Sequence, residues 1–415
     1  MDYKMLNEIL EINPKLPLKK GTYAKKIAME NLSEYQMKIK TFSFGKYKGG
    51  SKFQNGDTLL AKITPCLENG KIAYVDILED EEIAFGSTEF FVIRGLEGKG
   101  DDKYIYYLMN DSRLKDKVIK SMVGTSGRQR AQKESILNYE YPVPDYSMQK
   151  KIGEFLYLFD KKIQTDKEII NNLEHISQTL FKRWFIDFEF PNEDGEPYKS
   201  SGGKMIDLDI GRIPANWKVK KFKDIVELID NRGKTPPLAK DKTEYPILDV
   251  KVVSGLSRVI ELDKAQKFVE KNTYDNWFRS GHPKKGDILL STVGSIGETK
   301  LFMGNKGCIA QNVVALRANG NENFYLYEYL KFIKKELLSY NIGSVQPSIK
   351  ITHILKKEII VPENRIIEQF NYLYKTINEK IFLLSNQLDR LNQVRDTLLP
   401  KLLSGEIKIP DNLEV

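Results

Sequence analysis

The stretch Gly56-Asp57-Thr58-Leu59-Leu60-Ala61 decides how this chain is organised, because it recurs later as Gly286-Asp287-Ile288-Leu289-Leu290-Ser291. A Gly-Asp pair followed by apolar residues is typical of a turn that leads into a strand. Other segments repeat in the same order: a loop of small residues at 124–129 and 343–348, then YEYPVP at 139–144 and KEIIVP at 357–362. This self-similarity predicts two copies of one structural unit.

After the last proline of each copy, the pattern changes to that of a long helix, so we expect the order globular unit, helix, globular unit, helix. The globular units are predicted to be α/β or α+β, with strands at 72–75, 89–93, 247–251 and 312–316 and short helices at 103–110 and 324–335. The expected division is a first globular domain at 1–145, a long helix at 146–190, a linker at 191–212, a second globular domain at 213–362, a second long helix at 363–408 and a tail at 409–415.

Both long helices carry a heptad-like apolar seam, with steps of three and four residues. The first seam consists of Ile152, Leu156, Phe159, Ile163, Ile170, Leu173, Leu180 and Trp184, with Asp166 and Ser177 in the two remaining positions. The second consists of Phe370, Leu373, Ile377, Ile381, Leu384, Leu388, Leu391, Leu398 and Leu402, with Arg395 in one position.

Such helices can be ordinary core helices or can pair with each other as a coiled coil. We favour an antiparallel coiled coil within the chain, because the first helix must deliver the chain to the second globular unit and the second helix must run back. The predicted shape is a pseudo-twofold dumbbell, with two heads held apart by a helical rod.

Composition narrows the class of protein. The formal net charge of +8 over 415 residues favours polyanionic partners such as nucleic acid. Cys66, Cys308 and the three histidines do not have metal-ligand spacing, so we expect no metal site. The first residues do not form a signal peptide, and no run reaches the roughly 20 apolar residues of a membrane helix. We therefore expect a cytoplasmic protein without a membrane partner.

At this point the residues resemble a known family. Residues 53–71 (FQNGDTLLAKITPCLENGK), followed by Gly86-Ser87-Thr88-Glu89-Phe90, resemble the target recognition domain of type I restriction–modification specificity subunits. The segments similar to a second such domain are Ile213-Pro214 through Trp217, RGKTPP at 232–237, residues 286–300 and Gln311-Asn312. TLFKRWF at 179–185 and LLPKLLSGEI at 398–407 resemble the ends of the family's two spacer helices.

The resemblance implies a DNA sequence-specificity subunit without catalytic activity. Each head would read one half of a split DNA target, and the helical rod would fix the number of unread base pairs between the halves. Because the two heads differ outside their shared framework, the target is expected to be asymmetric.

The resemblance also implies partners. These are double-stranded DNA, two methyltransferase subunits that modify adenine N6, and restriction subunits with ATP-driven translocase and nuclease activity where they are present. No cofactor is expected in this chain, since S-adenosylmethionine, ATP and Mg²⁺ would belong to the partner subunits.

Candidate DNA-binding residues lie on predicted loops, where polar side chains can reach base edges and lysine or arginine can contact phosphates. In the first head they are Lys20, Thr22, Tyr23, Lys46, Lys48, Lys52, Ser87, Thr88, Ser126, Arg128, Gln129 and Arg130. In the second head they are Arg232, Lys234, Thr235, Thr292, Ser295, Gln311, Asn312, Ser344, Gln346 and Lys350. The alternative for any one of them is a solvated turn.

Large apolar side chains at the ends of the long helices either close the core or bind partner subunits. The candidates for a partner interface are Phe181, Trp184, Phe185, Leu399 and Leu403. The sequence alone leaves these two roles open.

The motifs of the expected partner enzymes are missing. Pro236-Pro237 is the sole Pro-Pro pair and lacks the flanking residues of an adenine methyltransferase motif, and no Walker A loop is present. Asp287 with Glu298-Thr299-Lys300 fits a loose metal-nuclease pattern, but the repeated Gly56-Asp57 lacks the same spacing. The alternatives to a specificity subunit are therefore a non-catalytic DNA-binding scaffold or regulator and, as a minor one, a Mg²⁺-dependent nuclease.

Overall fold

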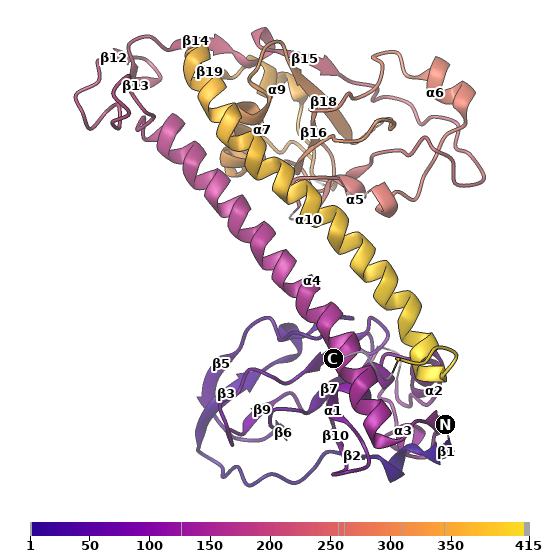
Figure 1. The fold of residues 1–415 in the computed structure, drawn as a ribbon. Helices are drawn as coiled ribbons and strands as arrows, with labels where there is room; N and C mark the ends of the chain where they lie inside the picture. The colour runs from indigo at the N-terminus through magenta and orange to yellow at the C-terminus, as the bar shows by residue number, and fades with distance from the viewer. Residues whose placement is uncertain are drawn as a thin grey trace. The chain divides into compact units, whose positions relative to one another are not determined.

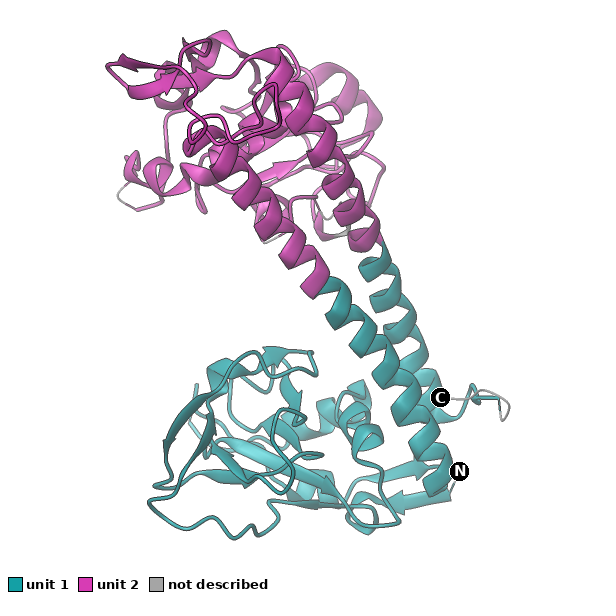
Figure 2. Ribbon diagram, turned by 60° about the vertical axis from the view of Figure 1, so that its left-hand side comes forward, with its two compact units in different colours: residues 1–167, 387–415 teal, residues 168–386 magenta. Residues whose placement is uncertain are grey.

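The computed structural model describes residues 2–125, 127–255, 257–260, 262–309, 311–343 and 345–410. These divide into two compact units (Figure 2). Unit 1 comprises residues 1–167 and 387–415, and unit 2 comprises residues 168–386. The division crosses both long helices, so each unit contains one globular part and one segment of each long helix.

Unit 1 is built on two sheets of order β2-β10-β7-β8-β4 and β5-β3-β9-β6, and a separate pair joins β1 to β11. Its strands are β1 (Asp2–Met5), β2 (Leu10–Ile12), β3 (Tyr23–Ile27), β4 (Ser33–Glu34), β5 (Ser43–Lys46), β6 (Ser51–Phe53), β7 (Thr58–Ala61), β8 (Lys71–Tyr74), β9 (Ala84–Gly86), β10 (Phe90–Gly95) and β11 (Glu140–Val143). Its short helices are η1 (Leu6–Glu8), η2 (Met29–Asn31), α1 (Asp102–Leu108), α2 (Ser112–Lys120) and α3 (Glu134–Leu137).

Unit 2 repeats the first of these sheets, with the order β15-β18-β16-β17, and the outer pair is β14 with β19. Its strands are β12 (Met205–Leu208), β13 (Gly211–Pro214), β14 (Lys218–Lys221), β15 (Val226–Ile229), β16 (Ile288–Ser291), β17 (Thr299–Leu301), β18 (Val313–Ala318) and β19 (Glu358–Val361). Its short helices are η4 (Phe222–Asp224), α5 (Val250–Val253), η5 (Leu262–Lys264), α6 (Lys271–Trp277), α7 (Asn323–Phe332), α8 (Lys334–Ser339) and α9 (Ile351–Lys356).

The repeated Gly-Asp stretches begin the central strands of the two sheets. Asp57 precedes β7 and Asp287 precedes β16, as the turn-to-strand pattern predicts. Each aspartate is buried and accepts two hydrogen bonds from an arginine of the neighbouring strand: Arg94 on β10 at 2.7 and 2.8 Å, and Arg317 on β18 at 3.0 and 2.8 Å. The repeat therefore preserves an internal ion pair along with the apolar strand.

One predicted strand is wrong. Residues 247–251 were expected to form a strand, but Val250–Val253 form a turn of helix. The Asp249 side chain accepts a hydrogen bond from the backbone N–H of Lys251 and so caps this turn. Val252 and Val253 are buried against the sheet, and this packing outweighs their intrinsic preference for a strand.

The segment predicted as a polar linker is folded. Tyr198 stacks on Phe190 with ring centroids 4.5 Å apart, and Phe190 stacks on Trp217 at 5.0 Å. The antiparallel hairpin β12–β13 follows, with Met205 paired to Pro214. This segment therefore adds apolar surface to the core of unit 2.

The two long helices are α4 (Tyr146–Phe181), which continues into a π-helical turn at Lys182–Ile186, and α10 (Asn364–Ser404) (Figure 1). In unit 1 the start of α4 meets the end of α10, since Arg395 donates to Asp160 at 2.5 Å. In unit 2 the end of α4 meets the start of α10, with Phe185 and Phe370 4.8 Å apart. Each unit therefore brings segments of both long helices together, and their pairing as an antiparallel coiled coil stays a prediction.

The seam predicted for the second helix needs one correction. Leu373 is 43% exposed, whereas Tyr374, Asn378 and Ile381 are buried. The seam from Phe370 therefore advances by four, four and three residues. A polar Asn378 and a tyrosine hydroxyl occupy two of its positions, so a count of apolar residues alone placed this part of the seam on the wrong side of the helix.

Candidate nucleic-acid interface

Polar loops gather at one edge of the main sheet in unit 2. Antiparallel pairing places Ser291, at the end of β16, opposite Val313, at the start of β18. Ile229, at the end of β15, pairs with Ala315 of the same strand. The chain therefore leaves β15 and β16 and enters β18 at a common edge. We call residues 230–235, 292–296, 311–312 and 345–350 the loop edge of unit 2.

Backbone hydrogen bonds hold these loops together. The Thr292 N–H donates to the carbonyl oxygen of Asn312 at 2.8 Å, and the Ile349 N–H donates to that of Thr292 at 2.9 Å. The Gly294 N–H donates to the carbonyl oxygen of Pro347 at 2.8 Å. Not every side chain of these loops faces outward, since Thr292, a candidate DNA-binding residue, is fully buried, and Ile296 and Ile349 are buried as well.

The side chains of the loop edge of unit 2 fall into two classes. Arg232 is occupied internally: its guanidinium donates twice to Asp230, at 2.8 and 2.6 Å, and once to Thr292 at 3.2 Å. Gln311, in the left-handed backbone region with φ 50°, donates to the Thr235 hydroxyl. Lys234, Ser295, Gln346 and Lys350 are exposed as well, while Ser344 lies outside the described residues.

Unit 1 has the same arrangement at the corresponding edge. The Lys62 N–H donates to the carbonyl oxygen of Glu89 at 3.0 Å, and the Ala131 N–H donates to that of Lys62 at 2.8 Å. The Thr64 N–H donates to the carbonyl oxygen of Gln129 at 3.0 Å. The loop edge of unit 1 consists of residues 62–65, 87–89 and 127–131.

The candidate side chains of this edge differ in their availability. Arg130 forms a two-pronged ion pair with Glu89, at 2.8 and 2.9 Å, and these hydrogen bonds keep the pKa of Glu89 below its usual value. Ser87 accepts a hydrogen bond from the Glu89 N–H at 3.1 Å and so shapes the turn before β10. Thr88 and Arg128 are exposed, Gln129 is half-buried, and Ser126 lies outside the described residues.

The remaining candidates of unit 1 form a separate group on the second sheet. Tyr23 and Lys46 were expected on loops but are paired residues of β3 and β5. The Gly21 N–H donates to the carbonyl oxygen of Tyr47 at 2.8 Å, which keeps Lys20 and Thr22 close to Lys48. Lys52 is engaged in the fold, since its ammonium donates to the Leu16 carbonyl oxygen at 2.6 Å.

The candidates for a partner interface are mostly core residues. Phe181, Trp184 and Phe185 are 2, 5 and 2% exposed, and Leu403 is fully buried. Phe185 packs edge-on against Phe370 and against Tyr325 of α7, with both ring centroids at 4.8 Å. Of the two roles that the sequence left open, closing the core accounts for these four. Leu399 is partly buried against the core of unit 1.

The residues of the nuclease-like pattern are engaged within unit 2. Asp287 receives the hydrogen bonds from Arg317, and Glu298 forms an ion pair with Lys334 at 2.8 Å. Lys300 is fully buried on β17. Within the described ranges, no group of three or more His, Cys, Asp or Glu residues is placed to hold a metal ion.

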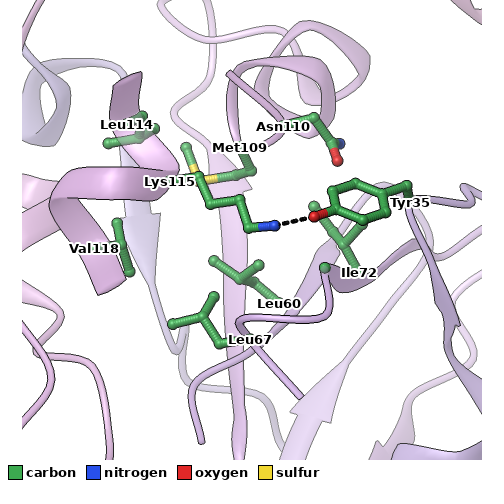
Figure 3. A pocket seen from close by; sticks show the side chains of 10 residues that line it. Tyr35, Leu60, Leu67, Ile72, Met109, Asn110, Leu114, Lys115 and Val118 are labelled. Carbon is green, nitrogen blue, oxygen red and sulfur yellow. Dashed lines mark hydrogen bonds between the residues drawn. The ribbon is translucent and has the colours of Figure 1, made fainter. Parts of the chain in front are cut away.

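One small cavity lies in unit 1 between the main sheet and α2 (Figure 3). Its volume is about 10 Å³, and it is lined mainly by apolar residues such as Leu60, Leu67 and Met109. Tyr35 and Lys115 close its mouth through a hydrogen bond. A volume of this size is at the limit for one water molecule, so the cavity is a packing defect rather than a ligand site.

Sequence reasoning missed several residues of these surfaces. Asp230 orients Arg232, and the Asn341 side chain accepts the N–H groups of Gly343 and Ser348 at 3.0 and 2.9 Å. Val345 is 98% exposed at the tip of its loop. The Asp-x-Arg spacing from 230 to 232 was a usable signal, whereas nothing in the sequence marks an exposed valine.

Among helices of the described chain, none combines the length and the apolar character needed to cross a bilayer. The model of the type I restriction modification DNA specificity domain matches residues 1–175 and again residues 214–390. The two matched segments follow the internal repeat.

Several relatives are similar over most of the chain. The type I restriction enzyme MjaIX specificity subunit of Methanocaldococcus jannaschii is 28% identical over 74% of this chain and 70% of its own length. The HindI specificity subunit of Haemophilus influenzae is 24% identical over 85% of this chain and 87% of its own.

A solved structure shows the same fold. The S subunit of a type I restriction–modification system from M. genitalium superposes with a TM-score of 0.59 at 15% identity, covering 99% of this chain and 96% of that one. Since the matched family segments span most of both units, this chain belongs to the family of type I restriction–modification DNA specificity proteins.

Proposed function

We propose that the chain is the non-catalytic specificity subunit of a type I restriction–modification complex, and that each unit reads one half of a bipartite DNA target. The observation that carries this proposal is the duplicated loop edge. Both units use the same backbone hydrogen bonds to present different exposed side chains, such as Arg128 in unit 1 and Lys234 and Gln346 in unit 2. Polar and basic side chains of this kind can contact base edges and phosphates.

The division into recognition domains at 1–145 and 213–362 and spacer helices at 146–190 and 363–408 belongs to the same proposal. Helices α4 and α10 contain 36 and 41 residues, which corresponds to about 54 and 62 Å at about 1.5 Å per residue. Paired as a coiled coil, they would act as the ruler that sets the number of unread base pairs.

The partners follow from the specificity role. Two methyltransferase subunits would bind S-adenosylmethionine and modify adenine N6 in each half-site. Restriction subunits, where present, would supply ATP- and Mg²⁺-dependent translocation and cleavage. The exposed faces of α4 and α10 and the half-buried Leu399 are the surface that remains for docking, since Trp184, Phe185 and Leu403 lie in the core.

Exchange of one unit tests this assignment. Residues 213–362 are replaced by the corresponding domain of a specificity subunit with a known target, and the methylated motif is read by single-molecule sequencing. The expected motif keeps the half-site of unit 1 and acquires the donor's half-site. A motif that changes in both halves, or in neither, would contradict the assignment.

A further inference from the structure

The second sheet of unit 1 exposes a row of aromatic side chains that its own core does not cover. Tyr23, Phe42 and Phe44 are 67, 42 and 54% exposed. The rings of Tyr23 and Phe44 are stacked, with centroids 5.9 Å apart and an interplanar angle of 11°, and Phe42 lies edge-on to Phe44 at 5.6 Å. We call these three residues the aromatic strip.

The strip lies along β3 and β5, the outermost pair of a four-stranded sheet (Figure 1). Strand register places Lys46 opposite Tyr23 and Lys25 opposite Phe44. The other face of this pair packs inward, since a Cβ at Gly45 would lie 3.7 Å from the Phe85 ring. The fold therefore buries Ala24 on one face of the pair and leaves Tyr23 and Phe44 exposed on the other, although Lys25 on that face is covered.

An internal role accounts for only part of the strip. Phe42 lies over the Lys25 ammonium at 5.2 Å, and that ammonium forms an ion pair with Glu82 at 2.9 Å. This contact explains Phe42 as a partial cover for a buried charge. Tyr23 and Phe44 are more exposed than Phe42, and their rings stack on each other at the surface. Exposed aromatic rings of this kind contribute little to the stability of the fold.

The chain segment that carries the strip is rich in lysine, although the acidic run at residues 79–82 lies beside it, where Glu82 pairs with Lys25. Residues 15–52 contain ten lysines, two glutamates and neither aspartate nor arginine, so their net charge of +8 equals that of the whole chain. Lys20, Lys46 and Lys48 are exposed next to the strip. This charge opposes edge-to-edge pairing with a second copy of β5 and favours a polyanion.

We propose that the aromatic strip is a DNA-contact surface of unit 1, separate from its loop edge, which packs rings against the sugars and the groove walls of duplex DNA while the adjacent lysines contact phosphates. The inference rests on the proposed function and adds a binding surface to it. Flat aromatic side chains interact with nucleic acid in a sequence-tolerant way, and lysine contacts make binding depend on salt. The strip would therefore raise affinity at one half-site without choosing its bases.

Unit 2 offers no matching surface. Among its described residues, the aromatic side chains that are largely exposed are Phe332 and Tyr372, and both are on helices. The effect of the strip is thus confined to the half-site that unit 1 reads.

Protein footprinting on the unmodified complex tests the strip directly. The chain, assembled with its methyltransferase, is exposed to hydroxyl radicals with and without a duplex that carries its methylated motif, and side-chain oxidation is measured by mass spectrometry. Tyr23 and Phe44 are expected to be protected at least threefold by the duplex. Tyr3 on β1, which is 71% exposed, is the internal control and is expected to stay unprotected.

Binding measurements give a second test. The double variant Tyr23→Ala/Phe44→Ala is expected to weaken binding of that duplex about tenfold, by the loss of apolar contact with sugars and groove walls. Tyr3→Ala is the matched control and is expected to stay within twofold of the parent. Lys46→Gln is expected to lower the dependence of log affinity on log salt by about one.

The outcomes separate this inference from the function on which it rests. A parent complex that methylates no bipartite motif means that the proposed function has failed. If the parent methylates such a motif but Tyr23 and Phe44 oxidise equally with and without DNA, the inference alone is overturned. Equal losses of affinity in the double variant and in Tyr3→Ala would also overturn it.

Discussion

Units 1 and 2 share one scaffold but differ in two regions. These are the loop edge of the main sheet and the contacts between each globular part and the long helices. The shared part is internal: the Asp57–Arg94 and Asp287–Arg317 ion pairs occupy corresponding positions, and matching backbone hydrogen bonds join the loops at the edge of each main sheet. The two units therefore share buried strands and turns, and they differ in their exposed side chains.

The first difference lies at the loop edges. In unit 1, Glu89 and Arg130 form an ion pair across the edge, and the corresponding residues of unit 2, by their backbone contacts, are Asn312 and Ser348. Unit 2 instead fixes an arginine, Arg232, through Asp230. Two edges with different charges and hydrogen-bonding groups would recognise different sequences, which supports an asymmetric target.

The second difference lies where each globular part holds the long helices. In unit 1, Asp160 of α4 accepts from the Tyr107 hydroxyl at 2.7 Å and from Arg395 of α10 at 2.5 Å. In unit 2, Arg258 donates twice to Glu174 of α4, at 2.7 and 2.8 Å, and is fully buried. The globular part of unit 1 thus contacts the long helices through a partly exposed cluster of polar side chains, whereas that of unit 2 does so through a buried ion pair.

Removing the buried arginine is expected to give the largest effect. Arg258→Met leaves Glu174 with Lys331, at 2.9 Å, as its remaining cation and removes the arginine that lies 3.6 Å from the buried Glu328. This loss in a dry site is expected to cost about 3–5 kcal/mol of unfolding free energy. Chemical denaturation measures the loss, and hydrogen exchange should show it in unit 2. A buried Arg258 that could be replaced without loss would contradict this reading of unit 2.

The corresponding substitution in unit 1, Arg395→Met, tests whether the two units differ in this contact. Arg395→Met removes one of two partners of Asp160 at a site where the arginine is still 17% exposed, and Tyr107 remains bound. The expected cost is about 1–2 kcal/mol, since water can reach the carboxylate. Equal losses from Arg258→Met and Arg395→Met would remove the distinction between the two anchors.

The next prediction concerns methylation and the two arginines at the loop edge of unit 1. Arg128 is exposed, whereas its neighbour Arg130 is bound to Glu89. Arg128→Ala is therefore expected to reduce methylation at the half-site of unit 1 by about tenfold or more, the size of one lost base contact, and Arg130→Ala by less. Methylation rates on duplexes altered in one half-site at a time measure both. A larger loss from Arg130→Ala would reverse the assignment of these two arginines.

The last prediction concerns the stability of the fold and two equivalent side chains, Asp102 in unit 1 and Asn323 in unit 2. Asp102 accepts the Gly95 N–H at 2.9 Å in unit 1, and Asn323 accepts the Ala318 N–H at 3.0 Å in unit 2. Burial raises the pKa of Asp102 to about 6 from its ordinary value of 3.8. The folded chain therefore binds a proton more tightly than the unfolded chain between these pH values, and stability is lost as pH rises through this window.

Asp102→Asn keeps the hydrogen bond and removes the charge, as unit 2 already does with Asn323. The variant is expected to be more stable than the parent by about 1–2 kcal/mol at pH 7.5 and to gain little near pH 4. Thermal unfolding at both pH values checks this. A gain that is the same at both pH values would show that the buried charge is not the cause.

Much of the fold could be predicted from the sequence because its signals are local. Backbone geometry is indicated directly by the Gly-Asp turns, by the prolines before each long helix and by the steps of three and four residues along those helices. Residues 247–251 and Leu373 were misplaced because tertiary packing decided them, through the burial of Val252 and Val253 and through the polar seam positions Tyr374 and Asn378.

The candidate site was less accessible to sequence reasoning. Whether Arg128 or Arg130 is available depends on Glu89, which lies 41 residues from Arg130 in the chain. The aromatic strip depends on the pairing of β3 with β5, which no local pattern marks. Buried Trp184 and exposed Tyr372 lie on neighbouring helices, and only their packing separates a core residue from a surface residue.

The most direct test of the central claim is single-molecule methylation sequencing of a host that lacks its own adenine methylation and expresses this chain with the methyltransferase from its gene neighbourhood. We predict one asymmetric motif, with two specified halves around a spacer of fixed length and unspecified sequence, and with methyladenine on both strands. A stable complex that modifies no adenine, or that modifies a single uninterrupted sequence, would contradict it.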